Sequence, residues 1–281
     1  MNYILITPVK NEELTLPKVA ECLIKQTQLP ILWVIIDGNS SDSTFQIAKE
    51  LSESFCWIAV INQKVFSKKG AHTNFSLSLN EAYEFVTSRK LDYVFIGKLD
   101  SDQIIPPNFF EFLINQFIEN PKLGAASGSI YSSDTNPLKP DVYPKDELPD
   151  KRLYRKDALE DIGGFPITKY SPDTVVLAKL RMRGWEIKSF PEISIINMRK
   201  DGGLERNHWA SSVQFGRAKY YLGYHPLLLL MGCGYTLMHQ DVVKSIGLFY
   251  GYMSSWMKKD EVTGDKEIWE YFRYKRIREV I

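Results

Sequence analysis

The sequence predicts an α/β protein in which helices flank a mostly parallel β-sheet, followed by a helical C-terminal extension. Two observations lead to this fold class. Apolar runs alternate with helical patterns through the first hundred of the 281 residues, with short connections between them, as in strand–helix–strand units. From about Gly202 the chain becomes helical in pattern, aromatic and basic. We therefore expect two domains, 1–200 and 201–281.

Four continuous apolar runs predict the central strands of the sheet, at residues 3–7, 31–37, 56–62 and 92–100. An unbroken apolar run is typical of a parallel strand that helices cover on both faces. Later strands are expected at 123–132, 185–190 and 193–198. Ligands of such sheets bind beyond the carboxyl ends of the strands. The residues just after positions 7, 37 and 100 are therefore the first candidates for a binding site.

Helical patterns separate these strands. They cover residues 14–26, 42–52, a segment following Gly70, 105–119, 153–165 as a short helix, and 171–184. A proline pair starts the helix at 105–119, and Gly163-Gly164 ends the short one. A proline-rich segment at 132–150 is expected to be a long loop, which in a compact domain tends to be functional or mobile.

Charge and cysteine content exclude several classes of protein. The net charge of +1 gives no overall attraction to nucleic acid, so no nucleic-acid partner is expected. The three cysteines are widely spaced and form no CxxC motif, which argues against a disulfide framework or a zinc site and favours a reducing compartment. The first apolar run is too short for a signal peptide, and no run reaches the roughly 18 apolar residues of a membrane span. These features predict a cytoplasmic location.

Acidic residues stand where the predicted elements begin or end. Asp37 closes the second strand, Asp100 and Asp102 form a D-x-D sequence after the fourth, and Asp173 opens a late helix. Two carboxylates on one loop can hold a hard cation such as Mg²⁺ or Mn²⁺, which binds diphosphate oxygens. A separate carboxylate can deprotonate an acceptor hydroxyl.

Six segments in order resemble the motifs of family 2 glycosyltransferases with the GT-A fold, a Rossmann-like fold. They are residues 7–12, 34–44, 69–74, 98–102, 155–165 and 171–187. The resemblance covers roughly residues 1–200. It implies transfer of a sugar, with inversion, from a nucleotide-diphosphate sugar to a hydroxyl of a glycan or lipid-linked acceptor. A UDP-sugar is the favoured donor and a GDP-sugar the alternative.

The resemblance also implies roles for individual residues. Asp173 matches the general base of inverting members. Asp102, with Asp100, matches the ligands of a divalent metal, Mg²⁺ or Mn²⁺. Asp37 matches the residue that hydrogen-bonds the nucleobase. The positions that match the nucleotide site are Pro8, Val9, Asn11, Glu12, Asp37, Lys69, Asn74 and Asp100, and those beside the donor sugar and acceptor are Gly163, Gly164 and Phe165.

The sequence departs from the family pattern at two points. Many members carry two acids at the position of Pro172-Asp173, so Asp161 or Asp157 becomes the base if Asp173 is not. The histidine that serves many relatives as a further metal ligand is absent from residues 197–199, and His208 is the substitute we consider. The segment at 214–217 resembles part of the motif of processive synthases. The Trp that follows this motif in those synthases is replaced by Ala218, and the sequence has no segments for a transmembrane channel. Both observations argue against processive synthesis.

Each candidate residue also has a structural interpretation. Asp37 can cap a turn, Asp100 and Asp102 can be a solvated pair, Asp173 can be a first-turn acid, and Gly163-Gly164 can be a helix C-cap. Tyr131 and Tyr143 can stack on a sugar or pack on the protein body. The side chains of Lys98, Arg152 and Arg155 can bind phosphate or the nearby carboxylates.

The C-terminal extension combines aromatic and apolar residues with Lys and Arg. Such helices are typical of a membrane interface, so we expect attachment to the cytoplasmic face of a membrane. The alternatives are that they cover the catalytic domain or form an oligomer interface. Two other functions stay open: a non-catalytic nucleotide-sugar-binding subunit, and a nucleotidyltransferase on a similar fold. The second would need a glycine-rich phosphate loop that residues 7–13 do not provide.

Overall fold

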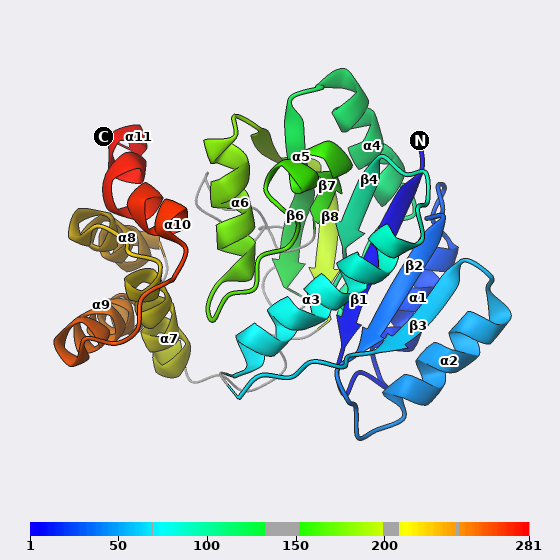
Figure 1. Ribbon diagram of the computed structural model, residues 1–281, viewed down its shortest axis with the longest axis horizontal. Coiled ribbons are helices and arrows are strands. Elements are labelled where there is room, and N and C mark those ends of the chain that lie inside the picture. Colours follow the sequence, from blue (N-terminus) through cyan, green and yellow to red (C-terminus); the bar gives the residue numbers. More distant parts are fainter. Residues whose placement is uncertain (69, 133–151, 199–207, 240–241, 281) are drawn as a thin grey trace. The chain divides into compact units, whose positions relative to one another are not determined.

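The computed structural model describes residues 1–68, 70–132, 152–198, 208–239 and 242–280 (Figure 1). The chain divides into two compact units. Unit 1 comprises Met1–Ile167 and Pro172–Lys200, and unit 2 comprises Thr168–Ser171 and Asp201–Ile281. Lys69, Tyr143 and the rest of segment 133–151 lie outside the described residues. His208 begins a helix, but its side chain also lies outside the description.

One eight-stranded sheet forms the centre of unit 1, in the order β3-β2-β1-β4-β7-β6-β8-β5. The strands are β1 (Tyr3–Val9), β2 (Leu32–Asp37), β3 (Ile58–Asn62), β4 (Phe95–Lys98), β5 (Gln103–Ile104), β6 (Leu123–Ser132), β7 (Arg152–Arg155) and β8 (Glu186–Asn197). The first four are mutually parallel. In the other half, β7 runs antiparallel to β4 and β6, and β5 runs antiparallel to β8.

Six helices cover the two faces of this sheet. They are α1 (Leu16–Ile24), α2 (Thr44–Ser54), α3 (Ala71–Ser88), α4 (Phe109–Glu119), α5 (Lys156–Asp161) and α6 (Pro172–Met182). The side chains of β1 alternate between two cores, as the period of two in a strand requires. Tyr3 and Leu5 pack with α1, α2 and α4, whereas Ile4 and Ile6 pack with α3, α5 and α6. The expected fold class, helices on both faces of an α/β sheet, is confirmed.

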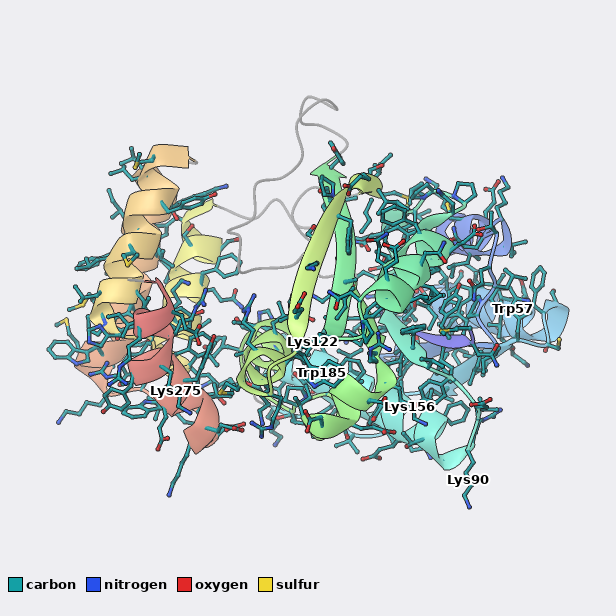
Figure 2. All side chains as sticks on the ribbon, turned by 90° about the horizontal axis from the view of Figure 1, so that it is seen from above. Trp57, Lys90, Lys122, Lys156, Trp185 and Lys275 are labelled. Carbon is teal, nitrogen blue, oxygen red and sulfur yellow. The ribbon has the colours of Figure 1, made fainter. Side chains whose placement is uncertain are left out.

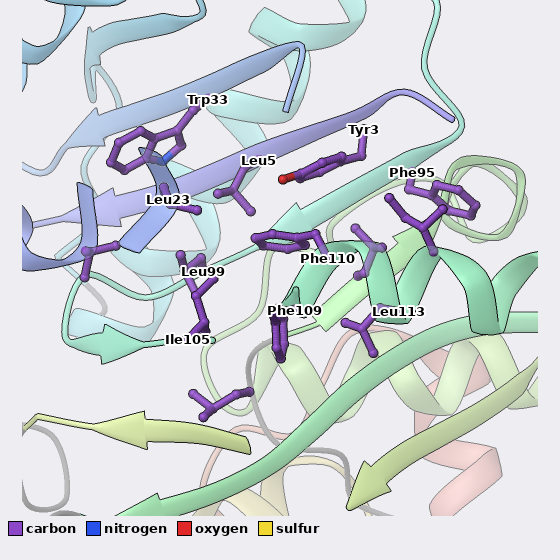
Figure 3. Close-up of a cluster of buried hydrophobic side chains, with 14 of the residues drawn as sticks. Tyr3, Leu5, Leu23, Trp33, Phe95, Leu99, Ile105, Phe109, Phe110 and Leu113 are labelled. Carbon is purple, nitrogen blue, oxygen red and sulfur yellow. The ribbon is translucent and has the colours of Figure 1, made fainter. Parts of the chain in front are cut away.

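Aromatic residues fill much of the core on the face of the sheet that α1, α2 and α4 cover (Figure 3). Tyr3 stacks on Phe110 with ring centroids 4.7 Å apart, and Phe110 meets Phe109 edge to face. The side chain of Trp33 is fully buried, and its indole N–H donates to Thr7 Oγ1 at 2.9 Å. Rigid packing below β1, β2 and β4 fixes the ends of these strands, where the candidate site begins.

Two expectations about secondary structure were wrong, and one strand was missed. Residues 153–155 belong to strand β7 and not to a helix, which starts only at Lys156. The two strands expected at 185–190 and 193–198 are one strand, β8, and its pairing with β6 shifts register between Gly128 and Ser129. This irregularity accommodates Pro191, since proline is tolerated at bulges. The two-residue strand β5 was not expected at all.

Unit 2 is helical, as expected for the C-terminal extension. It contains α7 (His208–Tyr221), α8 (Pro226–His239), α9 (Val242–Lys258), α10 (Lys266–Glu270), the π-helical segment η2 (Tyr271–Lys275) and α11 (Arg276–Val280). Helices α7 and α9 pack backbone to backbone, because a Cβ at Gly251 would lie 2.1 Å from the carbonyl oxygen of Val213. No helix in the described part of the chain combines the length and hydropathy that crossing a membrane requires.

Candidate functional site

The loops after β1 and β2 are joined by hydrogen bonds. Val9 and Asp37 are register partners at the ends of these parallel strands, so the loops start side by side. The side chain of Asp37 is buried and accepts from the N–H of Ser40 at 3.0 Å and from its hydroxyl. Asn11, which has a left-handed backbone with φ of 56°, accepts from the N–H of Ser41 at 2.9 Å. The two loops therefore form one rigid edge.

The other residues predicted after β1 belong to the same edge. Pro8 lies opposite Ile36 in the sheet. Glu12 donates its N–H to Thr44 Oγ1 at 2.6 Å, and its carboxylate accepts from the hydroxyl of Thr15 at 2.6 Å. Pro8, Val9, Asn11, Glu12 and Asp37 thus lie at the carboxyl ends of β1 and β2, as expected for a binding edge in an open sheet.

Asn74 is tied to this edge through Gln63, a residue that sequence reasoning missed. The backbone N–H of Gln63 donates to the carbonyl of Asp37 at 2.9 Å, and its side-chain amide donates to the carbonyl of Asn74 at 3.0 Å. The side-chain oxygen of Asn74 accepts from the N–H of Ser67 at 2.6 Å. The only sequence signal for Gln63 is its place directly after the third strand.

A cluster of four charged side chains lies at the end of β4. Lys98 Nζ lies 3.2 Å from both carboxylate oxygens of Asp173 and 3.8 Å from Asp100 Oδ1. Arg152 Nη1 lies 2.9 Å from Asp173 Oδ1. The side chains of Lys98 and Arg152 are only 2% and 3% exposed, against 28% for Asp100 and 21% for Asp173. We call these four residues the charged cluster.

The sheet register explains why this cluster needs two acids. Lys98 and Arg152 are direct partners across the antiparallel β4–β7 pair, and like charges in that relation destabilise a sheet. Asp173, in the first turn of α6, and Asp100 supply the opposite charge. The ammonium of Lys98 therefore contacts both Asp100 and Asp173, at 3.8 Å from Asp100 Oδ1 and 3.2 Å from Asp173 Oδ1. The two carboxylates lie close together for this reason.

Asp102 lies next to the C-terminal end of β8. Its carbonyl accepts from the N–H of Met198 at 2.8 Å. Next to it, the amide of the fully buried Gln103 donates to Asn197 Oδ1 at 2.8 Å. The segment that lacks the expected histidine is thus hydrogen-bonded to the D-x-D loop. Gln103 and Asn197 fasten that contact and were not predicted as site residues.

The donor chemistry of this loop fits a divalent cation only in part. Asp100 and Asp102 are both partly exposed and offer hard carboxylate oxygens, which Mg²⁺ and Mn²⁺ prefer. Mg²⁺ is commonly held by one or two protein carboxylates, with phosphate and water completing the coordination. Within the described residues, no three side chains of His, Cys, Asp or Glu gather as a metal site would require.

Gly163, Gly164 and Phe165 have a clear structural role. Both glycines have left-handed backbones, with φ of 81° and 85°, and their N–H groups bond carbonyls of the last turn of α5. They therefore form the helix C-cap. The buried ring of Phe165 meets the rings of Tyr83 and Tyr154 edge to face, with centroids 5.7 Å apart. Their contact with a sugar stays a prediction.

The alternatives to Asp173 lie in other surroundings. Asp161 accepts a hydrogen bond at 3.0 Å from the indole of Trp185, which Figure 2 labels, and Asp157 is an exposed first-turn residue of α5. The guanidinium of Arg155 donates to carbonyls of Phe117 and Leu123. The three cations weighed from sequence therefore divide, with Lys98 and Arg152 contacting carboxylates and Arg155 contacting backbone carbonyls.

Burial also affects a neighbour of the cluster. Tyr154 is fully buried, and its hydroxyl accepts a hydrogen bond from Arg152 Nη1 at 3.4 Å. Burial raises the pKa of this phenol, and it outweighs the opposing charge of Arg152, which lowers that pKa. Tyr154 is therefore a neutral support for Arg152 at physiological pH.

Comparison with known proteins identifies the family. Residues 4–171, more than half of the chain, match the model of glycosyl transferase family 2. Among curated proteins, poly-beta-1,6-N-acetyl-D-glucosamine synthase from strains of Staphylococcus aureus is 27% identical over 178 residues. The match covers 56% of this chain and 40% of the synthase, so the chain spans less than half of that relative.

Solved structures show the same fold. The mannosyltransferase PcManGT from Pyrobaculum calidifontis, in complex with GDP-Man and Mn²⁺, superposes with a TM-score of 0.59 at 13% identity, over 92% of this chain and 75% of that one. S. aureus TarS in complex with UDP-GlcNAc gives a TM-score of 0.56 at 16% identity, over 78% and 67%. These likenesses confirm the GT-A fold. On the family match, this chain belongs to glycosyl transferase family 2.

Proposed function

We propose that this protein is an inverting glycosyltransferase that moves a sugar from a nucleotide-diphosphate sugar to a hydroxyl of a glycan or lipid-linked acceptor. The observation that carries the proposal is the charged cluster, in which Lys98 joins Asp100 of the D-x-D loop to Asp173. The carboxylates expected on the donor side and on the acceptor side thereby lie in one place. Family membership and a curated relative that makes a polysaccharide support this reading.

The nucleotide is proposed to bind along the edge formed by the loops after β1 and β2. Asp37 accepts from Ser40 through both oxygens, and each carboxylate oxygen keeps capacity for another donor such as a base N–H. The nucleotide site would comprise Pro8, Val9, Asn11, Glu12, Asp37, Lys69, Asn74 and Asp100. A UDP-sugar is the favoured donor, because Asp37 matches the residue that hydrogen-bonds the nucleobase in the family. A GDP-sugar is the alternative, and structures of both kinds are known for this fold: TarS with UDP-GlcNAc and PcManGT with GDP-Man.

Asp102, with Asp100, would hold Mg²⁺ or Mn²⁺. When bound, such an ion neutralises charge on the leaving diphosphate. His208 stays a candidate for a further ligand. The Mn²⁺ in the PcManGT complex supports a divalent cation for this fold.

Asp173 is proposed to act as the general base. Its carboxylate takes the proton of the acceptor hydroxyl while the hydroxyl oxygen forms a bond to the anomeric carbon. The bond from that carbon to the diphosphate oxygen breaks on the opposite face, and its electron pair leaves with the nucleoside diphosphate. One displacement inverts the anomeric configuration. Gly163, Gly164 and Phe165 are proposed to lie beside the sugar and acceptor.

The test combines binding and turnover. Thermal shifts with UDP-, GDP- and dTDP-sugars, with Mn²⁺ or with EDTA, identify the donor, because a ligand stabilises the folded state that binds it. Release of the nucleoside diphosphate is then followed with that donor and candidate acceptors. Sugar transfer with inversion is the expected result. Binding without transfer would favour the non-catalytic subunit. Formation of the nucleoside triphosphate and the sugar 1-phosphate from the nucleotide sugar, when pyrophosphate is added, would favour a nucleotidyltransferase.

We further propose that unit 2 attaches the enzyme to the cytoplasmic face of a membrane. Large apolar side chains are exposed along α8 and α9: Leu227, Leu230, Met231, Leu237, Met238, Val242, Val243, Ile246, Phe249, Tyr250, Trp256 and Met257. The described residues of these two helices include Lys244 and Lys258 but no acidic residue. This combination suits the surface of a bilayer that contains anionic lipid.

The test of this attachment is co-sedimentation with vesicles of anionic phospholipid. The full chain should be recovered with the vesicles, and a variant with Leu230, Met231, Trp256 and Met257 changed to Ser should not. A matched control changes the exposed Leu14 and Ile118 of unit 1 to Ser. Equal recovery of all three proteins, or of none, would end the proposal.

A further inference from the structure

Lys98 and Arg152 are the two most buried members of the charged cluster, and neither takes part in the chemical step of the proposed reaction. They come from strands β4 and β7 and face each other across the sheet. Burying two like charges side by side is costly. The contacts of Lys98 and Arg152 with the carboxylates of Asp100 and Asp173 offset this cost, and they indicate the role of the two cations.

The carboxylate of Asp173 is held unevenly by these two cations. Oδ1 accepts from Arg152 Nη1 at 2.9 Å and from Lys98 Nζ at 3.2 Å, whereas Oδ2 accepts only from Lys98, at 3.2 Å, among the described residues. A carboxylate offers about four acceptor sites. Oδ1 is thus engaged twice, and Oδ2 keeps an unused site on a side chain that is 21% exposed.

The ammonium of Lys98 is itself fixed from several sides. It lies 3.8 Å from Asp100 Oδ1 and 4.7 Å from the centroid of the Phe75 ring, a cation–π contact. Arg152 is steadied by Tyr154, whose hydroxyl lies 3.4 Å from Nη1. Neither cation can swing far without breaking buried contacts, so both are suited to orient a neighbour.

From this geometry we propose that Lys98 and Arg152 are positioning residues for the transfer reaction. Arg152 holds the Asp173 carboxylate by Oδ1 and Lys98 contacts both oxygens, and the remaining acceptor site of Oδ2 receives the proton of the acceptor hydroxyl. Through its contact with Asp100, Lys98 also sets the separation between the general base and the D-x-D loop. This inference rests on the proposed function, in which Asp173 is the base.

The competing role for two buried cations is direct binding of the donor diphosphate. The two roles differ in kinetics. A residue that only orients the base lowers kcat and leaves donor binding intact, because its effect is confined to the transition state. A residue that contacts the diphosphate weakens donor binding as well.

The experiment compares Arg152→Met, Arg152→Lys, Lys98→Met and Asp173→Asn with the double variant Arg152→Met/Asp173→Asn. Each is assayed for kcat, donor KM and UDP affinity at a temperature where it is folded. Arg155→Met is the matched control, since Arg155 lies on the same strand but donates to backbone carbonyls. It should lose stability and keep its kcat.

We expect kcat to fall about tenfold or more in Arg152→Met and in Lys98→Met. In Arg152→Met, where the proposed role of the residue runs only through Asp173, donor KM and affinity for the nucleoside diphosphate should stay within about twofold of wild type. Arg152→Lys, which keeps the charge without the fork geometry, should fall between Arg152→Met and wild type. In the Asp173→Asn background, Arg152→Met should cause no further loss, because it acts through Asp173.

Three results would overturn the inference while leaving the proposed function standing. They are an unchanged kcat in folded Arg152→Met, a parallel loss of UDP affinity, and a full additional loss in the double variant. If Asp173→Asn keeps wild-type turnover, or if wild type transfers no sugar from any donor, the proposed function itself falls and the inference falls with it.

Discussion

Replacing Asp173 by Asn removes a negative charge that two buried cations share, and this change should destabilise unit 1 as well as slow the reaction. In the wild type, Lys98 and Arg152 both contact Asp173, and both are at least 97% buried by side chain. After the substitution they face each other across β4 and β7, and Asp100, 3.8 Å from Lys98, remains beside them.

The size of the effect follows from these contacts. Removing one partner of a buried ion pair costs about 3–5 kcal/mol. The Asn oxygen still accepts a hydrogen bond and Asp100 remains, so we expect about 2–3 kcal/mol of lost unfolding free energy. For a domain of this size, that corresponds to a fall in Tm of about 4–12 °C. Turnover should fall about 10²–10⁴-fold if Asp173 is the base.

Thermal and urea unfolding of wild type and Asp173→Asn at neutral pH measure the stability term. The double variant Arg152→Met/Asp173→Asn is the control: it removes one stranded cation, so the two single losses should not add. A Tm within about 1 °C of wild type for Asp173→Asn would refute the argument, since it would mean that the buried cations do not depend on this carboxylate. Turnover is then measured well below the Tm, where loss of folding cannot imitate loss of the base.

Three further predictions concern packing and burial. Gly164→Ala should cost about 2–4 kcal/mol of unfolding free energy in urea titrations. The reason is that Gly164 has φ of 85° and that a Cβ there would lie 2.7 Å from the ring of Tyr83. Gly163→Ala has the same backbone penalty but open space around the new Cβ, so it should cost only about 1–2 kcal/mol. Burial raises the pKa of Tyr93 to about 12, so its folded pKa exceeds the unfolded value and stability should fall as pH rises from about 10 to about 12. Tyr93→Phe should show a smaller fall over that range, and should be no less stable at neutral pH because the buried hydroxyl has no hydrogen-bond partner in the described part of the chain. Gly251→Ala should lose about 3 kcal/mol or more by forcing α7 and α9 apart, whereas Gly234→Ala, with no atom within 4 Å, should gain up to about 1 kcal/mol in the same unfolding assay.

The central strands could be predicted because their signal is local. Residues 3–7 and 31–37 are covered by helices on both faces, so nearly every side chain in β1 and β2 is buried and the apolar run is unbroken. The candidate edge could be predicted for the same reason: once the strands are parallel, the residues that follow them meet at one side of the sheet. Asn11 and Asp37 lie there together.

Strand β7 could not be predicted in this way. Its sequence, Arg-Leu-Tyr-Arg, has charged residues at both ends and continues without a break into helix α5. The buried Arg152 is paired with Asp173, 21 residues later. A local pattern does not contain such a long-range pairing, so the run resembled the start of a helix. The short strand β5 is similar, because its two residues are ordered by pairing with the end of β8.

The charged cluster is not what selection for stability alone would produce. Replacing a buried ionic group by apolar residues of similar size often leaves a protein as stable as before or makes it more stable. Like charges opposite one another also weaken a sheet. Packing therefore gives no reason for Lys98, Arg152 and Asp173 to meet inside unit 1. Departures of this kind are expected where chemistry requires a charge to be held at a fixed place. Because Lys98 contacts both Asp100 and Asp173, the cost in stability falls at the point where the donor side and the acceptor side of the proposed reaction must keep a constant separation.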